Sequence, residues 1–194
     1  MKKFSLYLAL ISLLIGGVLF YNVTHHVTVG SISSATPAPW QPAQLSIPAL
    51  KVDAPVINVG QTAQGLMDAP VSQAINSPYW THVFWYEPGA APGQAGNAVI
   101  AGHVDRVGGD PAVFWYLKDL VPGNDVYVTT VQGQKLHFVV NHIVSYPATA
   151  SSADVLNTIF GTTTGHHLNL ITCNGIWTGS GYDQRLVVFT TQVS

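Results

Sequence analysis

Cys173 is the only cysteine in the 194 residues, and its thiolate would be the strongest nucleophile that this chain can present. It follows the β-rich run 169–172 and precedes Asn174 and Gly175, so we expect it where a strand meets a turn. A thiol is mostly protonated near neutral pH, so nucleophilic chemistry needs a neighbour that generates or stabilises the thiolate. The alternative interpretation is a buried cysteine that packs as a small apolar residue.

His103 is the best placed of the eight histidines to partner this thiol. It follows the apolar run 97–101 and opens a glycine-rich loop, which again predicts a strand end. His166 and His167 precede Cys173 by six or seven residues on one extended run, which separates them from it by roughly 20 Å. A histidine that only forms a hydrogen bond in a turn remains the alternative for His103.

The chain contains two arginines, Arg106 and Arg185. A guanidinium is permanently charged and donates several hydrogen bonds, so beside a thiol it could hold a carbonyl oxygen as negative charge develops there. Arg185 begins the predicted last strand, whereas Arg106 falls in a predicted exposed loop. Spacing alone does not choose between them, because an arginine at the start of a strand is ordinarily a solvated edge residue.

Short β-rich runs separated by Pro, Gly, Asn and Asp recur from Leu45 onward. They cover 45–47, 52–59, 97–101, 126–130, 136–146, 167–173 and 185–191. Seven or eight strands in about 150 residues indicate a closed barrel or a sandwich. Two segments, 111–120 and 151–160, have helical patterns. Two short helices cannot cover both faces of a parallel sheet, so we expect mostly antiparallel strands and a mainly-β fold.

The N-terminal stretch from Phe4 to Val23 carries no charge, and its 20 residues would span about 30 Å as a helix, the thickness of a bilayer core. Lys2 and Lys3 before it place the N-terminus in the cytoplasm and the rest of the chain outside the cell. We therefore expect an uncleaved signal-anchor over 1–27, a Pro/Ser/Thr-rich extracellular spacer over 28–43, and one domain over 44–194.

Composition and motifs exclude several other functions. The formal net charge of −2 argues against a nucleic-acid partner. The sequence holds no phosphate-binding loop, dinucleotide-binding glycine motif, CxxC pair or HExxH pair. His137 and His142 are five apart on one predicted strand, so we expect them on opposite faces, unable to share a metal. We expect no cofactor and no metal.

Residues 170–173, Leu-Ile-Thr-Cys, resemble the TLxTC motif of sortases, which are membrane-anchored cysteine transpeptidases of Gram-positive cell surfaces. The Ala-Gly-His run that ends at His103 lies upstream and Arg185 downstream, in the family's order. The resemblance covers 44–194 and is closest to class F sortases. Asn169 departs from it, because the motif usually has Thr at that position.

This resemblance implies an eight-stranded sortase-type β-barrel with short helices, with Cys173, His103 and Arg185 as catalytic residues. It implies that Cys173 cleaves an LPxTG-like sorting signal between Thr and Gly, which leaves an acyl-enzyme. An amine of peptidoglycan or of its lipid-linked precursor would then accept the protein.

Two other functions remain open at this stage. An L,D-transpeptidase-like enzyme also uses an exported cysteine on a β fold, although it normally places Arg close after Cys and here Arg185 is twelve residues on. A non-catalytic barrel that binds a cell-wall or peptide ligand would leave Cys173 with a structural role.

Overall fold

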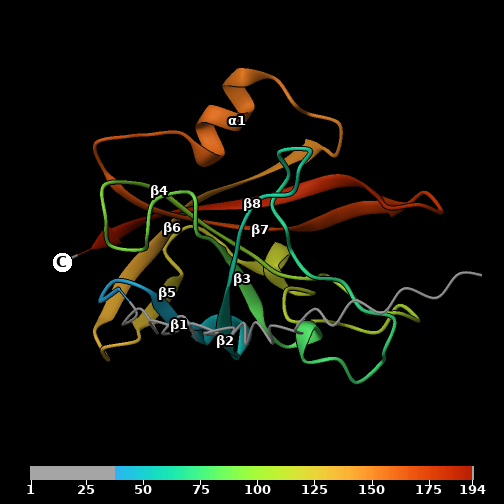
Figure 1. Ribbon diagram of the computed structural model, residues 1–194, viewed down its shortest axis with the longest axis horizontal. Helices are drawn as coiled ribbons and strands as arrows, with labels where there is room; N and C mark the ends of the chain where they lie inside the picture. Colours follow the sequence, from blue (N-terminus) through green and yellow to red (C-terminus); the bar gives the residue numbers. More distant parts are fainter. Residues whose placement is uncertain (1–37, 194) are drawn as a thin grey trace, which may run out of the picture. The chain divides into compact units, whose positions relative to one another are not determined.

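Eight β-strands close into one barrel in the computed structural model, which describes residues 38–193 (Figure 1). Around the barrel the order is β1-β2-β3-β4-β7-β8-β6-β5. The strands are β1 (Pro42–Ile47), β2 (Val52–Val59), β3 (Val83–Tyr86), β4 (Gly96–Ala101), β5 (Asp125–Thr130), β6 (Lys135–Pro147), β7 (His166–Trp177) and β8 (Tyr182–Val193). Only the β2–β3 and β4–β7 pairs are parallel. The predicted mainly-β, eight-stranded and mostly antiparallel barrel is confirmed.

Strand β3 is the strand that the sequence patterns missed. Its residues Val83, Phe84 and Trp85 are all buried. It pairs with β2 on one side and β4 on the other, so it lies inside the sheet. A strand covered on both faces is continuously apolar and lacks the alternation that identifies a half-exposed strand.

One α-helix, α1 (Ala153–Phe160), is present in the described residues, together with the 3-10 turns η1 (Pro48–Leu50), η2 (Pro78–Trp80) and η3 (Leu117–Asp119). The Ser152 hydroxyl accepts a hydrogen bond from the backbone N–H of Val155, which caps α1 as the pattern over 151–160 predicted.

The predicted helix over 111–120 was wrong except for the single turn η3. The backbone N–H of Ala112 donates to the carbonyl of Val104, and that of Phe114 donates to the carbonyl of His103. These bonds tie the segment to the loop after β4, and the N–H groups of Trp115 and Leu117 bond to carbonyls three residues back, which makes 3-10-type turns and not an α-helix. Phe114 is fully buried in the barrel, which fixes the segment along this path.

Strands β7 and β8 form a longer hairpin than predicted. β7 continues four residues past Cys173, and Arg185 is the fourth residue of β8, so both lie inside strands and not at strand ends. A register shift between Asn174 and Trp177, with Gly175 at φ +86°, lets the pairing continue. The hairpin extends beyond the rest of the sheet at the right of Figure 1.

A bulge in β6 corrects the prediction for its histidines. The register shifts between Val140 and His142, so Val140 and Ile143 both pack in the barrel interior. His137 and His142 therefore both point outward, and not to opposite faces as a regular strand would require. His142 stacks on Phe189 with 4.6 Å between the ring centroids.

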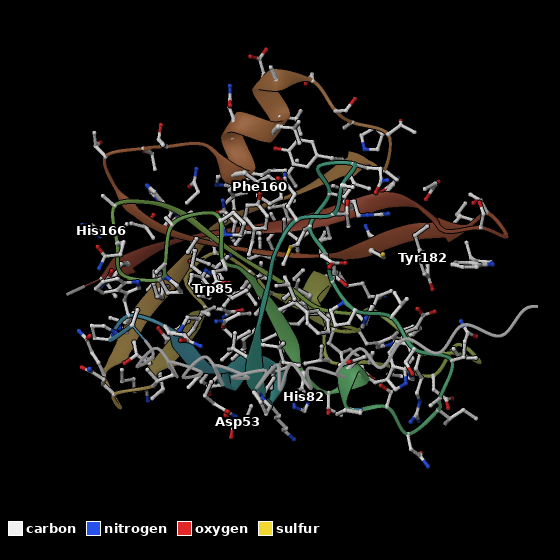
Figure 2. All side chains as sticks on the ribbon, viewed as in Figure 1. Asp53, His82, Trp85, Phe160, His166 and Tyr182 are labelled. Atoms are coloured by element: carbon white, nitrogen blue, oxygen red, sulfur yellow. The ribbon has the colours of Figure 1, made fainter. Side chains whose placement is uncertain are left out.

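The barrel interior forms the main core, and a second apolar cluster lies between α1 and the outer face of the sheet. Val99, Ile159, Val187 and Phe189 are its buried members. Phe160 points from α1 toward the sheet and packs on this cluster (Figure 2).

Two buried amides tie the end of α1 to the sheet. Nδ2 of Asn169 in β7 donates to the carbonyl of Ile159 at 2.7 Å, and Nδ2 of Asn97 in β4 donates to that of Gly161 at 2.9 Å. Asn169, the departure from the family motif, thus holds the helix in place.

The predicted membrane anchor, Phe4–Val23, lies outside the described residues. Within 38–193, no helix has the length and apolar character needed to cross a bilayer. Strand β1 begins at Pro42, three residues before the strand expected at Leu45.

Gly102 is the position where the barrel tolerates no side chain next to the candidate site. A Cβ there would lie 2.5 to 2.9 Å from three ring atoms of buried Phe114. We expect Gly102→Ala to lower the free energy of unfolding by about 1–3 kcal/mol through overpacking, as measured by urea denaturation. In the control Gly60→Ala, the added Cβ meets nothing within 4 Å, so the change should stay within about 0.5 kcal/mol. Equal losses would contradict the packing described here.

Candidate active site

Cys173 and Arg185 are direct partners across the β7–β8 pair. Residues directly opposite in an antiparallel pair project to the same face, with Cβ atoms about 4.5–5.5 Å apart. The preceding pair on that face, Ile171 and Val187, packs in the cluster beneath α1. The thiol and the guanidinium therefore lie on the outer face of the sheet, next to the helix.

The segment with His103 is fixed beside Cys173 by hydrogen bonds between β4 and β7. The hydroxyl of buried Thr172 donates to the carbonyl of Gly102 at 2.8 Å, and the N–H of Gly102 donates to the carbonyl of Ile171 at 3.0 Å. The residues that follow Thr172 and Gly102 are Cys173 and His103. Thr172 of the sequence motif thus joins the two segments that carry these side chains.

The imidazole of His103 is held by two rings and one carbonyl. Trp80 and Phe84 pack edge-on against it, with centroid distances of 5.0 and 5.4 Å. Its Nε2 lies 2.8 Å from the carbonyl oxygen of Pro70. A carbonyl only accepts hydrogen bonds, so Nε2 carries the proton and Nδ1 is the basic nitrogen of the neutral ring.

His103, Cys173 and Arg185 all line one apolar cavity of about 330 Å³ between α1 and the sheet. The helix contributes Val155, Leu156, Ile159 and Phe160 to its wall. The segment between β2 and β3 contributes Met67, Ala69 and Val71. A cavity of this character suits the apolar side chains of an extended peptide. The Cys173 thiol, His103 and Arg185 would then face the backbone of that peptide.

The ionisation of Cys173 depends on opposing effects. Burial of the half-buried thiol raises its pKa, the Arg185 guanidinium lowers it, and the Asp105 carboxylate raises it. Burial has the largest effect, so the pKa is above its ordinary value. The thiolate at this site thus depends on the cation across the strand pair.

Asp105 and Tyr182 link the loop after β4 to the β7–β8 hairpin. The Tyr182 hydroxyl donates to Oδ2 of Asp105 at 2.6 Å. This hydrogen bond is the main reason that the pKa of Tyr182 is raised to about 12, so the phenol remains a neutral donor at physiological pH. Figure 2 shows Tyr182 at the hairpin end of the β7–β8 pair, far from His166 at the other end.

The two arginines have different environments. Nη1 of Arg185 donates to the carbonyls of Tyr182 and Gln184, at 3.1 and 2.9 Å, which fixes the guanidinium beside the thiol. Arg106 instead forms an ion pair with exposed Asp110 at 3.1 Å, within the loop after β4. Sequence spacing left the choice open, and only Arg185 has Cys173 as its strand partner.

Sequence reasoning brought together the three residues of the site but missed their surroundings. Asp105 lies in the loop that His103 opens and was given no role from the sequence, although its position two residues after His103 was a usable signal. Tyr182 carried no local signal, because its contact with Asp105 depends on how far the hairpin extends.

Asp105→Asn should lower the pKa of Cys173, because it removes a negative charge that opposes thiolate formation. A lower pKa gives more thiolate at pH 7, so alkylation by iodoacetamide should be faster and its pH profile should move to lower pH. Asp119→Asn, an identical change at an exposed position, is the control and should leave the profile in place. An unchanged profile in Asp105→Asn would show that this carboxylate does not act on the thiol.

Comparisons with known proteins agree with this geometry. A sortase domain family model matches residues 45–193. Sortase A from Corynebacterium diphtheriae is 20% identical with a TM-score of 0.58, and the match covers 79% of this chain and 61% of that one. Sortase C1 of Streptococcus agalactiae, solved in complex with MTSET, is 18% identical with a TM-score of 0.58, and the match covers 78% of this chain and 66% of that one. Sortase C-1 from Actinomyces oris is 21% identical with a TM-score of 0.57, and the match covers 78% of this chain and 71% of that one.

These structural likenesses establish the fold, and the chain spans about two thirds of the length of the solved chains. No curated protein sequence matches it. The sortase domain match covers most of the chain, including the strands that carry Cys173 and Arg185 and the loop that carries His103. The chain therefore belongs to the sortase family.

Proposed function

We propose that this protein is a cysteine transpeptidase that cleaves an LPxTG-like sorting signal between Thr and Gly and transfers the protein to a cell-wall amine. The observation that carries the proposal is the pairing of Cys173 with Arg185 beside His103 on one apolar cavity. A non-catalytic barrel would need no cation opposite a half-buried thiol.

In the first half of the reaction, the apolar residues of the signal occupy the cavity beneath α1. The Cys173 thiolate attacks the carbonyl carbon of Thr, and the guanidinium of Arg185 stabilises the developing oxyanion. His103 donates a proton to the departing amine of Gly as the peptide bond breaks. The product is a thioester between Cys173 and the sorting signal.

In the second half, an amine of peptidoglycan or of a lipid-linked precursor attacks the thioester carbon. His103, now neutral, accepts a proton from the attacking nitrogen, and Cys173 leaves as a thiolate that Arg185 stabilises. The runs 46–56, 92–105 and 111–114, which resemble class F sortases, support assignment to that class within the family.

The full-length protein in detergent should form a covalent adduct with an LPxTG peptide. Mass spectrometry should place the acyl group on Cys173, with release of the fragment that begins at Gly. Cys173→Ala should lose both the adduct and turnover while it keeps the fold. Turnover retained in this variant would disprove the nucleophile assignment.

Arg185→Lys should lower kcat/KM for the peptide by at least about 100-fold, the effect of removing one oxyanion donor. Lysine keeps the charge but lacks the planar donor fork that bonds Tyr182, Gln184 and an oxyanion together. Arg106→Lys is the matched control and should change kcat/KM by less than about threefold, because Arg106 pairs with exposed Asp110. Equal losses in a steady-state assay would reject the role of Arg185.

We also propose that Phe4–Val23 anchors the enzyme in the cell membrane with the barrel outside. Its 20 uncharged residues after Lys2 and Lys3 support this orientation. Full-length protein should therefore stay in the membrane fraction through carbonate washing. Recovery of a soluble form that begins after about Thr24 would instead indicate a cleaved signal peptide.

A further inference from the structure

Cys173 lines three cavities, and their chemistry differs. The first is the apolar cavity beneath α1. The second, of about 750 Å³, lies between the loop after β4 and the β7–β8 hairpin, and it shares His103, Cys173 and Arg185 with the first. The third, of about 180 Å³, is lined by Trp115 and Lys118. Among the described residues that line these cavities, Asp105 is the only acidic one, and it lies in the second.

The presence of Asp105 there opposes the first half of the reaction. Its charge raises the pKa of Cys173, and thiolate is the form that attacks the sorting signal. Within residues 38–193, no cation forms an ion pair with Asp105. Its hydrogen-bond partner is the neutral hydroxyl of Tyr182, which fixes the carboxylate without cancelling its charge. The Asp105 carboxylate is therefore fixed beside the thiol, where it can bind a cationic ligand.

We propose that Asp105 binds the protonated amine of the acceptor and directs it to the thioester on Cys173. This inference rests on the proposed function, because it concerns the second substrate of that reaction. A sorting signal held beneath α1 occupies the apolar side of Cys173 and leaves the cavity at Asp105 as the side from which an acceptor can approach.

The charge of the acceptor matches this residue. Primary amines have pKa values of about 8 for an α-amino group and about 10.4 for a lysine side chain, so they arrive mainly as cations. Tyr182 bonds Oδ2 of Asp105, so the ammonium would bind through Oδ1. The second cavity also contains Arg185 and Arg106, of which Arg106 is paired with Asp110. The third cavity contains Lys118 and no acidic residue, so it offers no group to bind an ammonium.

The step balances in protons and bonds. The bound ammonium loses one proton to water, and the neutral amine attacks the thioester carbon. As the new C–N bond forms and the C–S bond breaks, the second proton passes to neutral His103 and Cys173 leaves as a thiolate. Asp105 touches the acceptor and exchanges no proton in this scheme.

The test is the partition of one acyl-enzyme between an amine and water, because this ratio is independent of the rate of acylation. Full-length enzyme is acylated with a labelled LPxTG peptide, and transfer and hydrolysis products are quantified by chromatography. Triglycine with an amidated C-terminus, whose ammonium is its only charge, serves as the cationic acceptor. Hydroxylamine, mainly uncharged at pH 7, serves as the neutral one. In Asp105→Asn, partition to triglycine should fall about tenfold, the effect of one hydrogen bond to a charged group. Partition to hydroxylamine should not change.

Asp119→Asn is the matched control and should leave both ratios unchanged. In the native enzyme, the apparent KM for triglycine should rise with ionic strength, whereas that for hydroxylamine should stay flat. This second measurement needs no variant. An unchanged triglycine ratio in Asp105→Asn, or an equal loss with both acceptors, would overturn the role of Asp105 and leave the proposed function intact. Failure of the native enzyme to form any acyl-enzyme would overturn the proposed function, and this inference with it.

Discussion

Burial of the Cys173 thiol raises its pKa and so disfavours the thiolate. The β7–β8 pairing places Arg185 directly across from the thiol, where its positive charge lowers that pKa. The guanidinium cannot lose its proton, so its field acts at every working pH. Two backbone carbonyls hold the Arg185 side chain beside the thiol. Thr172 joins β7 to the end of β4, which fixes the segment with His103 beside the same thiol.

The site is divided chemically along the same strand pair. On one side α1 supplies an apolar wall, held to the sheet by Asn169 and Asn97. On the other side the loop after β4 and the hairpin supply the charged wall with Asp105 and Tyr182. The proposed reaction uses two unlike substrates, an apolar peptide and a cationic amine. A single thiol between an apolar cavity and a charged one can accept each from its own side.

Local sequence pattern located seven of the eight strands and the helix α1, whereas the count of eight and the choice of Arg185 over Arg106 came from the resemblance to sortases. Ser152 and Gly161 bound α1 through contacts within a few residues, which a sequence displays directly. The features that the sequence did not predict depend on contacts between residues that are distant in sequence. Segment 111–120 has helical composition, but its backbone bonds to residues 103 and 104. Strand β3 has no alternation because its consecutive residues Val83, Phe84 and Trp85 are buried on both faces of the sheet. Asp105 and Tyr182 meet across 77 residues, only because the hairpin continues past the expected turn.

Register is the property on which the whole arrangement depends. A slip of one residue between β7 and β8 would turn Arg185 to the opposite face from Cys173 and remove the cation from the thiol. In an open sheet, a terminal strand is restrained by one neighbour alone. Here β8 is paired with β7 on one side and with β6 on the other, and a bulge near His142 fixes the β6 register against sliding. Pairing on both sides therefore leaves β8 no free edge along which to shift, and it holds Arg185 across from the Cys173 thiol.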